Sequence, residues 1–174
     1  MNFRTLPLRL LSCLVLGALA FSAVPNQGYA APSISKLSVQ GLRIAGSTRI
    51  VIDGGELLPN PQIVLPFPIT SQQLQPGSTA SRVEIEIVLG EAVPVGIYQL
   101  RVATDSGISN ARPVGVDHLP QSLLQETLQT LPAAISASVV ANESLRIRFA
   151  GKRGQRVVID VEARRLGSVL DPVV

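Results

Sequence analysis

The sequence predicts an all-β protein in which two β units follow an N-terminal leader. Strand-like segments recur about every ten to fifteen residues and are separated by Gly, Pro and Asn. In the clearest segments apolar and polar residues alternate, which is the period-two pattern of a half-buried strand. No long segment has helical periodicity. Together these observations favour β-sandwich architecture.

Residues 1–30 have the pattern of a signal peptide. Arg4 and Arg9 form a basic region, residues 10–24 are apolar, and Gly28-Tyr29-Ala30 supplies the small residues that a signal peptidase recognises. We expect cleavage after Ala30 and export to the periplasm, cell envelope or extracellular medium. A retained membrane anchor is the alternative, although the apolar stretch is shorter than the roughly 20 residues that span a bilayer. Lipidation at Cys13 is disfavoured, because this cysteine precedes most of the apolar stretch.

Loss of the leader changes the composition. Residues 31–174 hold 13 basic and 12 acidic residues, a net charge of +1, and no cysteine. This balance does not support nucleic-acid binding, which needs a concentrated basic face. The fold must form without disulfides. Its core must be aliphatic, because the only aromatic residues are Phe67, Tyr98 and Phe149.

Residues 31–118 form the first predicted unit. Its expected strands are residues 33–39, 48–53, 62–65, 82–89, 97–104 and 111–116. Residues 82–89 place apolar side chains at every second position, with Arg82, Glu84 and Glu86 between them. We interpret Glu84 and Glu86 as a solvated sheet face rather than a catalytic carboxylate pair, which must flank a substrate in a cleft. Asp105-Ser106-Gly107 predicts a hairpin loop, in which Gly supplies a positive φ.

Short glycine-containing motifs run through this unit. They are Pro32-Ser33-Ile34, residues 46–54, residues 96–102, Gly107 and Ser109-Asn110. These motifs resemble the IPT/TIG family, whose immunoglobulin-like domains are common in extracellular proteins. The resemblance implies an immunoglobulin-like β-sandwich. Tyr98, just after a turn at the start of a strand, is either a tyrosine corner or an ordinary half-buried strand tyrosine.

Residues 119–131 form a predicted linker. Residues 122–125 fit a helix capping box, and Leu124, Leu128 and Leu131 fall at helical spacing between Pro120 and Pro132. We expect a helix of about two turns or an irregular link. Its leucines more plausibly pack against the sandwich than form an amphipathic helix for a partner.

Residues 132–174 form the second predicted unit. Residues 135–140 are its first strand, and residues 145–149 and 157–161 are expected to form a hairpin. Matching the apolar faces pairs Phe149 with Val157, Ile147 with Ile159 and Leu145 with Val161, and places Arg146 opposite Asp160. Lys152 and Arg153 are then at the tip of the turn, between Gly151 and Gly154.

This unit is too short for a sandwich of roughly 100 residues. We expect either that the chain is the front part of a larger protein or that these strands lie against the first unit. Residues 149–161, residues 163–168 and Leu170-Asp171-Pro172 resemble the front half of a bacterial pre-peptidase C-terminal domain. This resemblance implies an incomplete jelly-roll-like sandwich. Some members bind calcium or an extracellular polymer, but residues 121–132 hold a single acid, Glu126, and we assign no calcium ligand.

The sequence offers no arrangement typical of catalysis. His118 is the only histidine and is adjacent to Asp117, but no nucleophile elbow accompanies the pair, so we interpret it as a solvated linker residue. One histidine and no cysteine in the exported chain make a zinc site improbable. No glycine-rich phosphate loop with its lysine is present. We therefore expect no catalytic residue, metal ligand or cofactor within this chain.

One basic cluster is the candidate for surface binding. It comprises Lys152, Arg153, Arg156, Arg164 and Arg165. Such a cluster could contact an acidic polymer or an anionic envelope surface. The alternative is that these residues are turn charges and the guard of an edge strand against aggregation.

These observations predict a non-catalytic exported module for adhesion, spacing or partner binding within a larger secreted or envelope protein. The expected partner is a protein or an extracellular polymer, with no nucleic acid and no membrane span after leader removal. The alternative is the N-terminal accessory part of a secreted peptidase, whose catalytic domain would lie beyond Val174.

Overall fold

The structure is a computed structural model that describes residues 30–139 and 143–170. Residues 1–29 of the predicted leader lie outside the described residues. Asp171 and Pro172, which belong to the motif that resembles the pre-peptidase C-terminal family, also lie outside them. The described elements are strands, apart from one short 3-10 turn, η1 (Arg164–Leu166). The chain is therefore all-β, as predicted.

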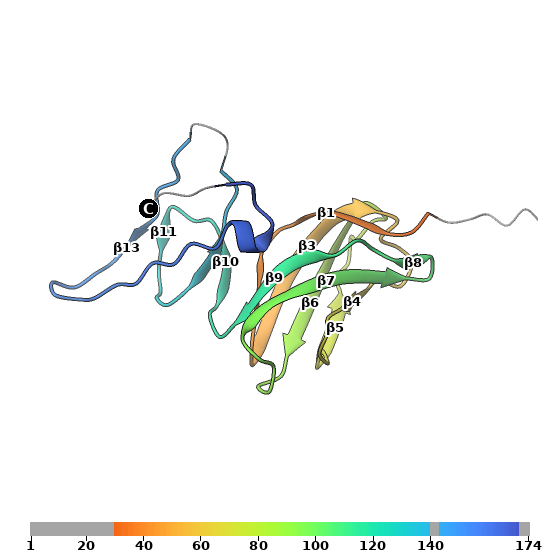
Figure 1. Ribbon diagram of the computed structural model, residues 1–174, viewed down its shortest axis with the longest axis horizontal. Coiled ribbons are helices and arrows are strands. Elements are labelled where there is room, and N and C mark those ends of the chain that lie inside the picture. Colours follow the sequence, from red (N-terminus) through yellow and green to blue (C-terminus); the bar gives the residue numbers. More distant parts are fainter. Residues whose placement is uncertain (1–29, 140–142, 171–174) are drawn as a thin grey trace, which may run out of the picture.

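Residues 33–117 form two sheets that face each other in a β-sandwich-like arrangement (Figure 1). The first sheet has the order β1 (Ser33–Leu37), β3 (Gly46–Gly55), β6 (Arg82–Leu89) and β5 (Ser71–Leu74). The second has the order β2 (Gly41–Arg43), β9 (Arg112–Asp117), β7 (Gly96–Thr104) and β4 (Gln62–Val64), and β8 (Gly107–Ile108) pairs with β7.

The six strands predicted for this unit are confirmed as β1, β3, β4, β6, β7 and β9, within three residues at each boundary. The hairpin is confirmed as well, because Thr104 pairs with Gly107 and Gly107 has a φ of 137°. Strands β2, β5 and β8 were not predicted from the sequence. β5 reads Ser-Gln-Gln-Leu and is exposed throughout, so no alternation marks it. The other two strands are only three and two residues long.

The core between the sheets is aliphatic. Alternate residues of β6 and β3 point into it, including Ile50, Ile52, Ile85 and Ile87, each no more than 1% exposed. Phe67 and Tyr98 pack only at its margin. Full burial of one such aliphatic side chain contributes about 1.5–3 kcal/mol relative to its exposed state. Burial of these side chains therefore holds the two sheets face to face.

The N-terminal segment belongs to both sheets. β1 runs antiparallel to β3, whereas β2, three residues later, runs parallel to β9. In the crossing, the Ser38 N–H donates to the Val51 carbonyl (2.9 Å) and the Ser38 hydroxyl accepts from the Val51 N–H (2.8 Å). The Gly115 N–H donates to the Gln40 carbonyl at 2.8 Å. The segment between β1 and β2 thus forms hydrogen bonds to the first sheet at Ser38 and to the second sheet at Gln40.

Side chains close the sandwich where backbone ladders end. The register of β1 shifts between Ile34 and Lys36. At this irregularity the Asn110 amide accepts from the Ile34 N–H (2.7 Å) and donates to the Ile34 carbonyl (3.0 Å). The Arg112 guanidinium also donates to the Ile34 carbonyl, at 3.1 Å. Asn110 therefore links the first sheet to the chain that enters β9.

The opposite side is closed in a similar way. The Gln72 side-chain oxygen, on β5 of the first sheet, accepts the Ile63 N–H of β4 in the second sheet at 2.7 Å. This backbone donor lies on the edge strand of its sheet, where no neighbouring strand is available. The Gln72 amide satisfies it and covers part of an edge that would otherwise be open to other chains.

The described residues of 119–139 and 143–170 form two small parallel strand pairs rather than a second sandwich. β10 (Gln121–Leu123) pairs with β12 (Ala134–Ser136), and β11 (Thr127–Leu128) pairs with β13 (Arg148–Phe149). The helical interpretation of residues 122–131 is wrong, because Ser122 lies within β10 instead of capping a helix. A helix of two turns is marginal in water, whereas β12 offers backbone partners to β10.

The predicted hairpin of residues 145–149 and 157–161 is also wrong. β13 pairs with β11, and residues 157–161 form no strand. Arg148 instead forms an ion pair with Glu126 (2.8 Å), and the predicted Arg146–Asp160 pair is absent from the described contacts. A two-stranded hairpin is marginal alone, and among the described residues no further sheet covers these two segments. Only the turn is as expected: the Gln155 N–H donates to the Lys152 carbonyl at 3.0 Å.

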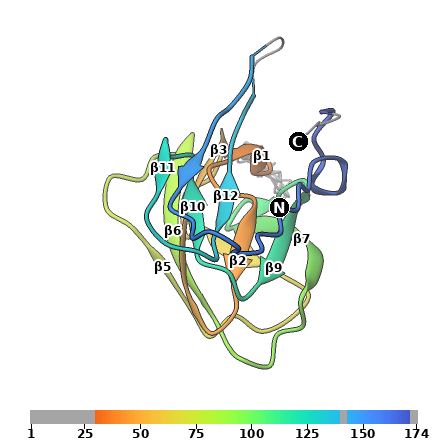
Figure 2. The ribbon, with the colours of Figure 1, turned by 90° about the vertical axis from the view of Figure 1, so that its left-hand side faces the viewer.

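This second part contacts the sandwich through the β2 end of the second sheet. The Gln40 N–H donates to the Ser136 hydroxyl at 2.7 Å. Figure 2 shows β10 and β12 at this end of the sandwich, where β10 contacts β2. Further along the chain, η1 packs against β9, where Gly167 lies close to Pro113. The second part thus contacts the sandwich through two separate segments, β10 with Ser136 and η1 with Gly167.

Gly54 permits the close approach of β1 to β3. A Cβ atom at this position would lie 1.8 Å from the Ser33 carbonyl oxygen. We expect Gly54→Ala to lower the free energy of unfolding by about 1–3 kcal/mol, because a backbone atom must move to make room. Urea denaturation of the two proteins measures this difference. Gly90→Ala is the control, since its Cβ would meet only Thr70 Oγ1 at 3.4 Å; equal losses for both variants would contradict the steric explanation.

The bidentate Asn110 contact provides a second test. Asn110→Ala removes one hydrogen bond to the Ile34 N–H and one to the Ile34 carbonyl, so we expect a loss of about 2 kcal/mol. Thermal or chemical denaturation measures it. Gln73→Ala, which shortens an exposed amide side chain on β5, should change stability by less than about 0.5 kcal/mol. A loss no larger than that of the control would show that Asn110 does not hold the two sheets together.

Candidate functional site

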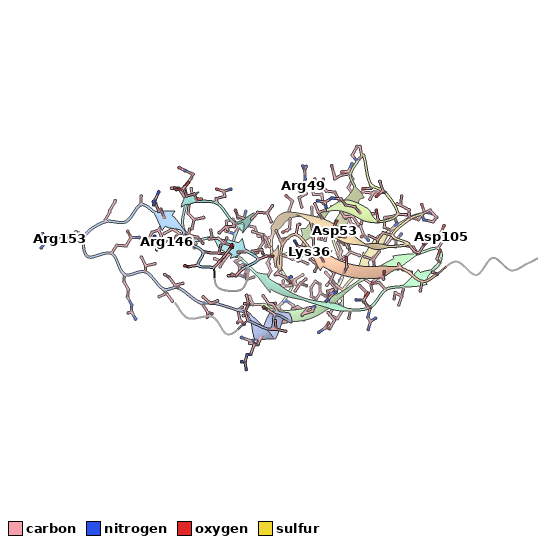
Figure 3. All side chains as sticks on the ribbon, turned by 90° about the horizontal axis from the view of Figure 1, so that it is seen from above. Lys36, Arg49, Asp53, Asp105, Arg146 and Arg153 are labelled. Carbon is pink, nitrogen blue, oxygen red and sulfur yellow. The ribbon has the colours of Figure 1, made fainter. Side chains whose placement is uncertain are left out.

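The outer face of the first sheet is covered by ion pairs. Arg49 lies 3.4 Å from Glu84 and 3.9 Å from Glu86, and Arg82 lies 2.7 Å from Asp53. Figure 3 labels Arg49 and Asp53 over this sheet. Glu84 and Glu86 are therefore partners of a cation on a solvated face, as the alternating pattern predicted. Each exposed pair contributes at most about 1 kcal/mol.

His118 lies on the surface just after β9. The neighbouring Asp117 carboxylate accepts hydrogen bonds from the Leu119 N–H (2.7 Å) and from the Gln121 amide (3.1 Å). These bonds direct the carboxylate toward the start of the linker. Within residues 30–139 and 143–170, no three His, Cys, Asp or Glu side chains are grouped so as to hold a metal ion. In the same residues, no helix has the length and apolar character needed to cross a membrane.

The outer face of the second sheet has an open apolar hollow of about 430 Å³. β4 and β7 build it, and its lining residues are Val64, Leu65, Pro66, Ile97, Tyr98, Gln99 and Arg101. Arg101 is the charged residue among these lining residues, and its guanidinium donates a hydrogen bond to the Ser109 carbonyl at 2.7 Å. This hollow was not predicted from the sequence, because it arises from the pairing of β4 with β7 and not from any local motif.

Tyr98 stands beside this hollow and has the hydrogen bond of a tyrosine corner. Its hydroxyl donates to the Pro94 carbonyl, four residues upstream, at 3.1 Å. Its ring meets Phe67 edge to face, with centroids 4.8 Å apart and planes at 87°. Of the two interpretations of Tyr98, the corner-type contact is thus the one present. It fastens the turn before β7 to that strand.

The five residues of the basic cluster fall into two groups. Lys152, Arg153 and Arg156 lie at or beside the turn after β13, which projects from the body of the protein (Figures 1 and 3). Arg164 and Arg165 lie on η1, which packs against β9. Arg165 forms an ion pair with Glu162 at 2.5 Å. The structure therefore separates a projecting basic turn, which we define as residues 151–156, from the η1 cations.

Exposed apolar side chains accompany the basic turn. Val158 is 80% exposed and Ile159 is 62% exposed, and Val157 beside them is 40% exposed. Residues 144–159 contain no Asp or Glu. The surface around the turn therefore combines positive charge with apolar area.

Comparison with models of known protein families and with the curated proteins finds no match to this chain. The two family resemblances drawn from the motifs therefore stay predictions.

The Tyr98 contact can be tested by mutation. Tyr98→Phe keeps the ring against Phe67 but removes the hydrogen bond to the Pro94 carbonyl, so we expect a loss of about 0.5–1.5 kcal/mol. Phe67→Leu should also destabilise the protein, through the lost aromatic contact. Denaturation of the single and double variants separates the two effects. A Tyr98→Phe protein as stable as the unmodified one would mean that the hydroxyl has no role in fastening the turn.

Proposed function

We propose that this chain is a non-catalytic exported module with an immunoglobulin-like β-sandwich, serving adhesion, spacing or partner binding within a larger secreted or envelope protein. The strand order carries the proposal. An immunoglobulin-like domain has strands A, B, E and D in one sheet and C, F and G in the other. β1, β3, β6 and β5 correspond to the first set, and β4, β7 and β9 to the second. The Tyr98 hydroxyl contact is a further feature of that fold.

The leader pattern supports export. A basic region, an apolar stretch and small residues ending at Ala30 are what a signal peptidase requires. The IPT/TIG-like motifs point in the same direction, since that family is common in extracellular proteins. A cysteine-free core of aliphatic residues folds equally well in an oxidising compartment, because it has no thiol to oxidise.

For residues 132–174 we propose the beginning of a jelly-roll-like unit. The motifs of the pre-peptidase C-terminal family support this, together with the exposure of side chains that such a unit would bury. Leu145, Ile147 and Phe149 are 36–38% exposed, and Ile159 is 62% exposed. Further strands packed on these segments would remove this apolar area from water.

The same family resemblance favours a second candidate. Pre-peptidase C-terminal domains accompany secreted peptidases, so the chain could be the accessory part of such an enzyme with its catalytic domain beyond Val174. The two proposals differ in the coding sequence that follows Val174. A catalytic motif there favours the peptidase, whereas repeated β modules favour adhesion or spacing.

Export is tested by expressing the full chain in a bacterium and measuring the intact mass of the protein in each cell fraction. We expect residues 1–30 to be absent and Ala31 to be the first residue of the exported protein. Replacing Ala30 by a bulky residue, as in Ala30→Leu, should block this cleavage. A protein that stays in the cytoplasm with its N-terminus intact would contradict the proposal.

The non-catalytic part of the proposal has its own test. The exported protein should release no product from general peptidase and esterase substrates above the level of a blank. Hydrolysis that disappears in the His118→Ala variant would contradict the proposal, because it would give the exposed His118 a catalytic role.

A further inference from the structure

The basic turn is built so that its cations face outward. The Lys152 N–H donates to the Gln155 side-chain oxygen at 2.9 Å, and the Gln155 N–H donates to the Lys152 carbonyl at 3.0 Å. Gly154 completes the turn with a φ of 82°. Because Gln155 satisfies these backbone groups, the side chains of Lys152 and Arg153 are not needed to hold the turn. Figure 3 shows Arg153 at the far end of the molecule.

The acidic residues near this end do not neutralise the turn. Among the described residues, Lys152, Arg153 and Arg156 form no ion pair. Two acids of this part of the chain are already engaged, Glu126 by Arg148 at 2.8 Å and Glu162 by Arg165 at 2.5 Å. Asp160, the first acid after the turn, lies four residues beyond Arg156. Three positive charges are thus concentrated on one projecting segment.

Val158 is the exposed apolar residue that lies on the same side of the chain as Arg156. In an extended segment, Arg156, Val158 and Asp160 share one face, and Val157, Ile159 and Val161 share the other. If further strands cover the second face, as proposed above for a jelly-roll-like unit, Val158 stays on the solvent side with Arg156. Val158 lies two residues after the turn and is 80% exposed in the structure.

We propose that the basic turn is a contact site for an anionic lipid surface, in which Lys152, Arg153 and Arg156 bind the head groups and Val158 enters the interface. This inference rests on the proposed function as an exported module and names a partner for it. Basic residues next to exposed apolar side chains are typical of segments that lie on anionic membranes. Each Lys or Arg near such a surface strengthens binding by about five-fold.

The geometry favours a lipid surface over a soluble polyanion. A long polyanion is held by a basic surface that continues along its length. Here Arg164 and Arg165 lie on η1 against β9, away from the turn, and Arg165 is paired with Glu162. Three cations and a valine at a projecting end instead suit a flat lipid surface, because only this end of the protein would contact it.

Co-sedimentation of the exported protein with vesicles tests this proposal. The vesicles contain either phosphatidylcholine alone or equal parts of phosphatidylcholine and phosphatidylglycerol, at low and at physiological salt. We expect binding only to the anionic vesicles, weaker at the higher salt. The Lys152→Ala/Arg153→Ala variant should bind about 25-fold more weakly. Val158→Ser should lower binding by at least about three-fold, through lost apolar contact.

The matched control is Lys36→Ala/Arg43→Ala, which removes the same two residue types from exposed positions on the sandwich. Its binding should equal that of the unmodified protein. If both double variants lose the same amount of binding to anionic vesicles, the proposal is overturned, because the net charge of the protein and not the basic turn would then determine binding. Tighter binding to immobilised heparin than to anionic vesicles, unaffected by Val158→Ser, would overturn it in favour of a polyanion. The intact mass of the exported protein tests the proposed function separately. If the leader is cleaved as expected but the protein does not bind anionic vesicles, the lipid contact is overturned and the proposal of an exported module is not.

Discussion

The main physical constraint on this protein is that an aliphatic core alone must hold the two sheets together, since residues 31–174 contain no cysteine. Burial is not directional, so by itself it would let one sheet slide or rotate over the other. Directional polar contacts are added where the backbone ladders end. The Asn110 amide binds both backbone groups of Ile34 on one side, and Gln72 binds the Ile63 N–H on the other. The crossing at Ser38 connects the two sheets covalently as well as by hydrogen bonds.

The two parts of the chain differ because only the first encloses a core. In the sandwich, apolar residues are buried and the charges on the first sheet's outer face are paired, as at Arg49 and Arg82. In residues 143–170, by contrast, valine and isoleucine side chains remain in contact with water. Exposed apolar area of this kind is usually covered by a partner or by further chain. Residues 143–170 are therefore the part of the chain whose apolar side chains lack cover, whereas the sandwich encloses its own.

Sequence reasoning succeeded where the signal was local. The alternation in β6 located the strand and both of its faces, because the side chains of neighbouring strand residues point in opposite directions. It failed at residues 122–131, where short strands replace the expected helix. It also failed at residues 145–161, where the two segments with matching apolar faces do not pair. In both cases the local pattern was compatible with more than one structure, and contacts with distant segments decided the outcome. The five basic residues predicted as one cluster fall into two groups, because η1 packs against β9 while the turn after β13 projects.

The sequence by itself determined the all-β class, the positions of the main strands, the aliphatic nature of the core and the tight turns at Gly107 and Gly154. These properties depend on the conformational preferences of residues that are near one another in the chain. Only the tertiary structure decided which strands are neighbours, that Asn110 and Gln72 close the sandwich, and that η1, with Arg164 and Arg165, packs against β9. The physical reason is that hydrogen-bond partners and cover for apolar faces come from segments far apart in sequence, and no local pattern specifies which of them will meet.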